Sequence, residues 1–173
     1  MIRCSLFGFF CLISFNSTVF ADEPSAGHYL LPKFGIMSVD LNNADPLISV
    51  GLLYGIGLTE TISFEAELNY GFSGGEHVKD SVKGEYRIST LAGYGVYRFP
   101  VTDNTYLKGK LGLLFEDIER NLDNGEAINT DDFGVAGGVG IGTQFGNMAT
   151  VEIEATLIDK NIIFYSLGAH YRF

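Results

Sequence analysis

Residues 62–72 read ISFEAELNYGF, and this stretch decides the fold. Apolar or aromatic side chains occupy every second position from Ile62 to Phe72, and the positions between them carry Ser63, Glu65, Glu67, Asn69 and Gly71. A period of two predicts a β-strand with two unlike faces, one apolar and one polar. Alternation alone does not say which face is buried.

The same alternation recurs along the chain, and no helical period competes with it. Pro32 cannot donate a ladder hydrogen bond, so we expect good pairing in the first segment to begin near Lys33. The connections after the second, fourth and sixth segments are shorter than those after the first, third and fifth, which is typical of an up-and-down meander with two unlike ends. The short link at 159–161 breaks this contrast. The alternating segments are 29–39, 48–58, 62–72, 86–97, 106–115, 133–145, 150–158 and 162–173.

The N-terminus has the pattern of a secretory signal peptide. Arg3 precedes an apolar run at 6–15, and small residues at Val19 and Ala21 predict cleavage after Ala21. Both cysteines lie in this segment, so we expect a single domain, 22–173, without disulfides. A net charge of −10 argues against a nucleic-acid partner, and no later apolar run reaches the roughly 18 residues of a membrane helix.

Three features indicate that the apolar face is the outer one. The polar face of 133–145 consists mainly of glycine and alanine, which suits a crowded barrel interior better than a solvated surface. Aromatic residues gather toward segment ends, as in the girdles of outer-membrane barrels. The chain contains no tryptophan, whereas lipocalins, the water-soluble alternative, carry one near their first strand.

With this orientation the charged face becomes the interior. A small barrel is just filled by its own side chains, and charges survive there when they are paired and hydrogen-bonded. The near balance of acidic and basic residues therefore predicts a salt-bridged interior without an open channel. The predicted network consists of Lys33, Glu65, Glu67, Arg87, Lys108, Lys110, Glu152, Glu154, His170 and Arg172.

The C-terminal segment has apolar or aromatic residues on one face, at Tyr165, Leu167, Ala169, Tyr171 and Phe173. With the signal peptide, the strand count and the connection lengths, it resembles the OmpA/OmpX-like eight-stranded family, without a periplasmic peptidoglycan-binding domain. The resemblance implies an all-β, eight-stranded antiparallel up-and-down transmembrane β-barrel of a Gram-negative outer membrane. It also implies a monomer in contact with outer-membrane lipids and lipopolysaccharide, whose C-terminal strand is read by the barrel assembly machinery.

The sequence offers no catalytic, cofactor or metal site that we would assign. Some barrels of this size act on lipid A, but no histidine here lies in the His-x-Ser pair of the deacylases. His77, Asp80 and Ser81 are close in sequence without a third orienting group. An acidic external loop includes Glu119, Asp123, Glu126, Asp131 and Asp132. It favours cationic ligands, and it has no EF-hand spacing for a divalent cation.

We therefore expect a non-enzymatic protein that acts in membrane integrity or in surface or host contact through its external loops. A lipid A-modifying enzyme is the first alternative, and a narrow pore is the second.

Overall fold

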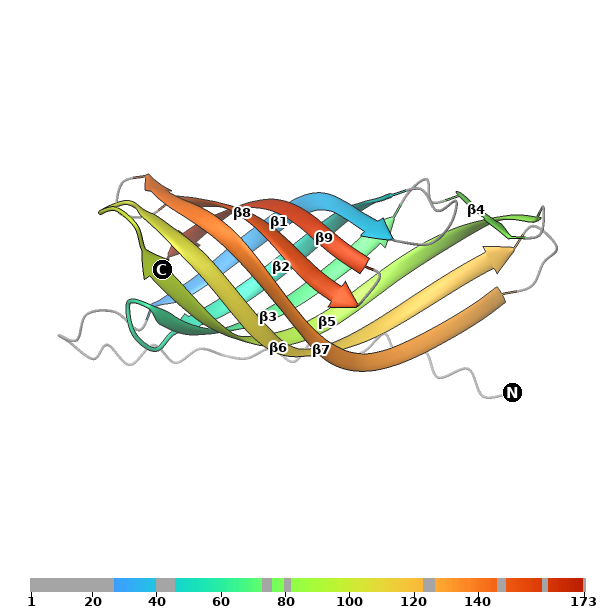
Figure 1. Cartoon of the computed structure of the whole chain (residues 1–173), viewed down its shortest axis with the longest axis horizontal. Coiled ribbons are helices and arrows are strands. Elements are labelled where there is room, and N and C mark those ends of the chain that lie inside the picture. Colours follow the sequence, from blue (N-terminus) through green and yellow to red (C-terminus); the bar gives the residue numbers. More distant parts are fainter. Residues whose placement is uncertain are drawn as a thin grey trace.

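The computed structural model describes residues 27–39, 46–72, 76–79, 82–122, 127–145, 149–159 and 162–172, and their regular structure is entirely β-strand. The predicted signal peptide lies outside these residues. Figure 1 shows strands that run obliquely around a barrel. They are β1 (His28–Val39), β2 (Leu47–Gly57), β3 (Ile62–Phe72), β4 (Glu76–Lys79), β5 (Val82–Pro100), β6 (Thr105–Leu122), β7 (Ala127–Phe145), β8 (Ala149–Asp159) and β9 (Ile162–Arg172).

Eight of these strands close into a ring. Each pairs antiparallel with its neighbour, β1 pairs with β9, and β3 pairs with β5. The short β4 pairs only with β5 and extends the sheet beyond the ring. This confirms the predicted eight-stranded antiparallel barrel. The described residues include no helix with the length and hydropathy needed to cross a bilayer.

The first strand begins earlier than the sequence suggests. β1 pairs with β2 from His28 onward, straight through Pro32. Its ladder with β9 is interrupted at Leu31 and Pro32 and resumes at Lys33. Proline lacks the N–H that one ladder needs, and a residue bonds to only one neighbouring strand through that group. The expected effect of Pro32 is therefore confined to the β1–β9 side.

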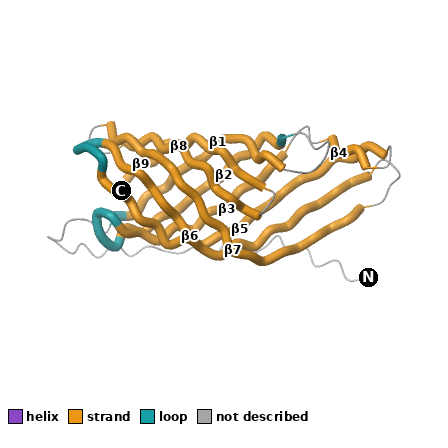
Figure 2. The backbone as a smooth tube through the Cα atoms, viewed as in Figure 1, coloured by secondary structure: helices purple, strands orange, loops and turns teal. Residues whose placement is uncertain are grey.

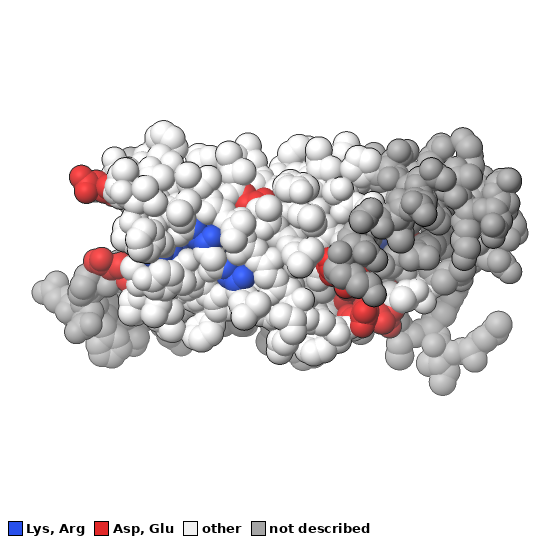
Figure 3. Space-filling model, viewed as in Figure 1, with Lys and Arg blue, Asp and Glu red and all other residues white. Residues whose placement is uncertain are grey.

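Large apolar side chains cover the outer wall. Leu111 is 66% exposed and Ile153 is 60% exposed, whereas Glu65 and Lys108 are each 3% exposed. Figure 3 shows one side of the wall, whose middle is mainly uncharged, while acidic residues gather toward both ends. The ring thus has apolar residues outside and ionisable residues inside, which is the reverse of a water-soluble carrier.

β5 departs from the expected assignment of faces. The sequence suggests that Tyr86, Ile88, Tyr94 and Val96 form the apolar outer face, yet all four are buried inside the barrel. Leu91, Tyr97 and Phe99 lie on the outer face instead, interspersed with glycines. Both faces of this strand carry apolar residues, so its alternation does not fix its orientation.

β5, β6 and β7 are much longer than the other strands and extend past the rest of the barrel (Figures 1 and 2). Much of the predicted acidic external loop, which includes Glu119 and Asp131, is therefore strand. β6 continues to Leu122, β7 begins at Ala127, and the two pair without a register shift. We call this end the hairpin end. The opposite end, with the turns at 58–61 and 101–104, is the turn end.

The outward apolar band predicts how the barrel responds to a charge placed in it. We expect Leu111→Arg, in the middle of the band, to lower the free energy of unfolding in lipid vesicles by about 2–4 kcal/mol. Leu58→Arg, at the turn end, should cost about 0–1 kcal/mol because its guanidinium reaches the interface. Urea titration followed by gel mobility measures both. Equal costs for the two variants would contradict a lipid-facing band.

Candidate functional site

The centre of the interior is built around one ammonium group. Lys108 Nζ lies 2.8 Å from Glu65 Oε2, 3.1 Å from Glu152 Oε2 and 2.9 Å from Glu154 Oε2. The lysine comes from β6, and the carboxylates come from β3 and β8. Lys108 therefore joins two walls of the ring that are not adjacent.

Two further lysines extend this network toward the hairpin end. Lys33 Nζ is 3.0 Å from Glu67 Oε2 and 2.6 Å from Glu154 Oε1. Lys110 Nζ contacts the same two oxygen atoms, at 2.7 and 2.6 Å. Glu67 thus contacts two ammonium groups and Glu154 contacts three, counting Lys108, and Thr156 donates a further hydrogen bond to Glu154.

The basic group nearest the turn end is Arg98, which the sequence reading missed. Its guanidinium donates to Glu65 Oε1 at 2.7 Å, to the Tyr29 hydroxyl at 2.7 Å and to the Ser63 hydroxyl at 2.6 Å. The sequence predicts Arg87 in this interior role, and that prediction is wrong. Arg87 is exposed on the outer face, opposite Glu119, because odd-numbered residues of β5 point outward. Both errors, the inclusion of Arg87 and the omission of Arg98, arise because the inward face of β5 was assigned to the wrong set of alternate residues.

With Arg98 in place of Arg87, four basic and four acidic side chains of the described residues form the lumen network. Every member is at most 7% exposed, and the opposite charges balance. Buried charges are tolerated on this condition, since an unmatched charge would bear its full desolvation cost. The lumen network consists of Lys33, Arg98, Lys108, Lys110, Glu65, Glu67, Glu152 and Glu154.

Aromatic rings surround the charged groups. Lys110 Nζ lies 4.1 Å from the centre of the Tyr94 ring, and Lys33 Nζ lies 5.3 Å from the centre of the Phe164 ring. At the other side of the network, the Tyr106 hydroxyl donates to Glu152, and His170 Nε2 is 3.7 Å from the same carboxylate. These contacts replace water around the ions with ring faces and hydroxyl groups.

The glycine-rich inner face of β7 provides the space for this network. A Cβ atom on Gly138 would lie 2.9 Å from Lys110 Cε, and one on Gly142 would collide with the Tyr106 ring. Lys110 and Tyr106 of the neighbouring strand β6 therefore occupy the volume that larger residues on β7 would fill. This need for space explains the glycine and alanine residues of 133–145 from which the sequence predicted a crowded interior.

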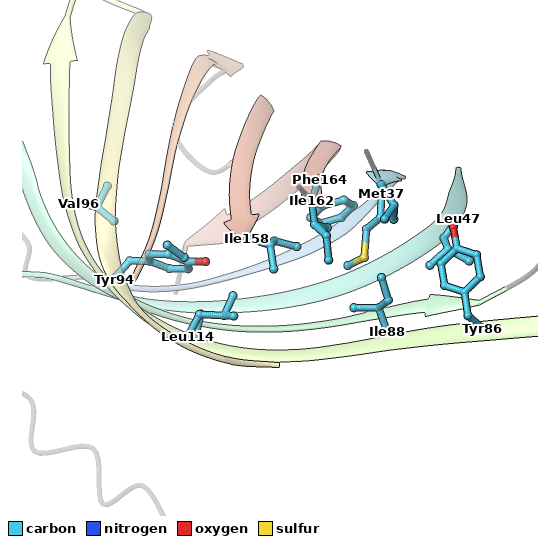
Figure 4. Packing of buried hydrophobic residues seen from close by; sticks show 13 residues of the cluster. Met37, Leu47, Tyr86, Ile88, Tyr94, Val96, Leu114, Ile158, Ile162 and Phe164 are labelled. Carbon is cyan, nitrogen blue, oxygen red and sulfur yellow. The ribbon is translucent and has the colours of Figure 1, made fainter. Parts of the chain in front are cut away.

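An apolar layer closes the interior between the lumen network and the hairpin end (Figure 4). The sequence did not predict it, because the inward face of most strands looked polar. Its side chains come from most of the ring and are buried together, and Tyr94 and Phe164 connect it to the lumen network. The larger members are Met37, Leu47, Tyr86, Ile88, Tyr94, Leu114, Ile158, Ile162 and Phe164.

Glu116 points inward from β6 between Leu114 and Ile118, at the level of the apolar layer. It is 5% exposed, and its Oε2 has no hydrogen-bond partner in the described part of the chain. Burial, together with the nearby carboxylates of Asp159 and Asp132, raises the pKa of Glu116 from 4.5 to about 6. This carboxyl group lies past the last outward apolar pair, Phe115 and Phe133, and so outside the apolar band.

A cavity of about 310 Å³ opens at the turn end. Arg98, Tyr29 and Tyr106 lie at its inner side, and its rim carries polar residues of the two turns, including Glu60 and Asp103. The cavity therefore ends at the lumen network.

The remaining predicted residues are placed as follows. Tyr165, Leu167 and Ala169 lie on the outer face of β9, and β9 pairs with β1 up to Arg172. The side chains of Tyr171 and Arg172, and Phe173, lie outside the described residues, as do Asp80, Ser81, Asp123, Glu126 and the His77 side chain. Glu119, Asp131 and Asp132 are exposed. Within the described ranges, no group of three His, Cys, Asp or Glu side chains is placed to hold a metal ion.

A family model described as outer membrane protein beta-barrel domain matches residues 7–173. No curated protein gives a sequence match. Among solved structures, Neisserial surface protein A aligns with a TM-score of 0.63 at 14% identity, covering 86% of this chain and 98% of that one. Ail of Yersinia pestis, in complex with the heparin analogue sucrose octasulfate, aligns at 0.60 and 14%, covering 85% and 97%. The N-terminal β-barrel domain of Pseudomonas aeruginosa OprF aligns at 0.54 and 17%, covering 84% and 97%.

The first prediction for the site concerns Lys108. Removing its charge leaves the carboxylates of Glu65, Glu152 and Glu154 in excess, so Lys108→Met should lower the free energy of unfolding by about 3–5 kcal/mol. Arg87→Met is the matched control, because it removes an exposed cation and should change stability by no more than about 0.5 kcal/mol. Denaturant unfolding in detergent measures both. Equal effects would rule out a dominant role for the network.

The second prediction concerns pH. Because the folded pKa of Glu116 lies above its ordinary value, ionised Glu116 destabilises the fold at high pH, and this penalty disappears as the pH falls below about 4.5. Glu116→Gln should therefore stabilise the protein by about 1–2 kcal/mol at pH 7.5. The gain should vanish by pH 4.5. If the difference in unfolding free energy between Glu116→Gln and the parent were the same at pH 7.5 and pH 4.5, repulsion on ionised Glu116 would be refuted.

Proposed function

Because this chain belongs to the outer membrane protein beta-barrel domain family, we propose that it is a closed, non-enzymatic barrel of the outer membrane that contacts partners through its hairpin end. The family supports the outer-membrane location. The contact function rests on one observation, the free edge of β7 beyond the ring.

The β7 edge runs from Ala127 to Ala136. β8 pairs with β7 only from Gly137 onward, so within the described residues the preceding part of β7 pairs with β6 alone. Gln144 N–H bonds toward the β6 side, to the Asn104 carbonyl oxygen. Because backbone groups alternate sides along a strand, those of odd-numbered residues such as Asn129 face the free edge.

A free strand edge is a template for another strand, and proteins usually protect such edges. Here the protection is partial. Asp132 Oδ1 accepts the N–H of Phe133 at 2.8 Å, and Asp131 adds negative charge beside it. An extended partner segment could pair with the remaining groups, and basic side chains on it would meet these carboxylates.

The acidic hairpin end also bears on the chemistry of the partner. Ail was solved with sucrose octasulfate, a polyanion. In this chain Glu119, Asp131 and Asp132 are exposed at the hairpin end, and the net charge is −10. This charge disfavours a sulfated ligand and favours a cationic one.

Two layers of the interior support a lumen closed to solutes. The lumen network pairs its charges across the ring, and the apolar layer fills the next level. A water-filled pore needs neither charge matching nor an apolar constriction. The narrow pore is therefore the weaker alternative, and steady single-channel openings from pure protein in planar bilayers would restore it.

The remaining expectations follow from the same fold. A ring without an open edge inside the lipid band favours a monomer, with outer-membrane lipids and lipopolysaccharide around it. We propose that the C-terminal strand is read by the barrel assembly machinery, and that the salt-bridged ring contributes to membrane integrity. A lipid A-modifying enzyme remains the runner-up, and a changed lipid A mass spectrum on deletion of the gene would favour it.

Asn129 tests the edge, because its backbone faces outward and its side chain is exposed. Asn129→Pro removes one edge N–H, whereas Asn129→Ala removes the side chain and keeps that N–H. We expect cells that display the protein to attach to an epithelial monolayer several-fold better than cells without it. Asn129→Pro should abolish the gain, and Asn129→Ala should retain it.

Heat-dependent gel mobility checks that both variants still form the barrel. Attachment that is equal for the two variants would remove the edge from the proposal. Attachment that never exceeds that of cells without the protein would remove the contact function.

A further inference from the structure

Glu116 lacks the partner that a buried carboxylate requires. In the described part of the chain no group donates a hydrogen bond to its Oε2, and no cation forms an ion pair with it. The carboxylates of the lumen network, by contrast, all contact lysine or arginine. A buried carboxylate without a donor is strongly disfavoured, and each such group calls for an explanation.

The described neighbours of Glu116 are polar, acidic or apolar. Its register neighbours are Thr90 on β5 and Asp132 on β7. Asp159, at the end of β8, is the other carboxylate close enough to act on it. The apolar layer flanks it along β6, with Leu114 on one side and Ile118 on the other. Among the described residues, the charged groups that act on Glu116 are therefore both acidic.

The three carboxylates come from three different strands. They are not among any group of described residues placed to hold a metal ion, so direct coordination of a small divalent cation does not fit. A planar guanidinium group suits a single carboxylate bound at two points, whereas an ammonium group directs three N–H donors in different directions. An ammonium group thus matches the charge of the carboxylates, and its three N–H donors can serve acceptors on three different strands.

We propose that Glu116, Asp132 and Asp159 form a binding site for a primary ammonium group at the hairpin end of the barrel. The group belongs either to a free polyamine or to a lysine side chain of a partner. The site shares Asp132 with the β7 edge, but it is centred on Glu116, which points inward, and it needs no strand pairing. Its failure would leave the proposed function intact, and the reverse also holds.

The test uses the full chain refolded in detergent, with spermidine as the probe and isothermal titration calorimetry at pH 7.5. We expect saturable binding that Glu116→Gln weakens at least tenfold. Glu119→Gln removes an equal charge from the outer face of the same strand and should leave the affinity within twofold. Asp159→Asn provides a second variant, and gel mobility verifies folding for each.

Two further measurements define the ligand. Choline carries a positive charge without N–H donors and should not compete with spermidine. A peptide with a single lysine, acetyl-Gly-Lys-Gly-amide, distinguishes the two sources: binding of the peptide alone indicates a partner lysine, and binding of spermidine alone indicates a polyamine. Lowering the pH to 5 should weaken either ligand, because Glu116 takes up a proton.

Four results would overturn the proposal. They are the absence of binding by both probes, equal affinity in Glu116→Gln and the parent, an equal loss in Glu119→Gln, and competition by choline at the concentration of spermidine. Displacement of spermidine by an equal concentration of magnesium ions would also reject an ammonium site in favour of a metal site.

Discussion

The space inside an eight-stranded ring governs the rest of this structure. Such a ring is just wide enough for its own side chains, so each inward residue must find both volume and a partner. Lys108 meets this requirement by contacting carboxylates from two opposing walls. Gly138 and Gly142 meet it by leaving room for Lys110 and Tyr106. Charge matching, small residues and aromatic rings over ammonium groups are three responses to the same narrow interior.

The sequence predicts a strand well where its two faces differ in chemistry. On β3 and β8 the alternation of apolar and acidic residues determines the inward face, and Glu65 and Glu152 lie where this pattern puts them. On β5 both faces are apolar, so Arg87 was placed inside and Arg98 was missed. The apolar layer was missed for a related reason. An inward isoleucine such as Ile88 looks like a lipid-facing one until the register with its neighbours is known.

The buried charges of the interior are paired in the lumen network, but the buried charge of Glu116 is not paired among the described residues. In the lumen network every ion has an opposite charge within reach, whereas the described charged neighbours of Glu116 are two carboxylates. Residues that lower stability are commonly retained where binding requires them. The sequence showed this region only as an excess of acidic residues. It could not show that one of them is buried, because the burial of Glu116 depends on how far β6 and β7 continue past the ring.

The closed wall has one interruption in the ladder that joins its first and last strands, at Pro32. The first and last strands meet along a ladder that lacks pairing at Leu31 and Pro32, while the β1–β2 ladder beside it is continuous. Local opening of a protein begins where the backbone is held by the fewest hydrogen bonds. The wall is therefore held unevenly on the two sides of β1, and near Leu31 and Pro32 β9 can separate from β1 more easily than β2 can.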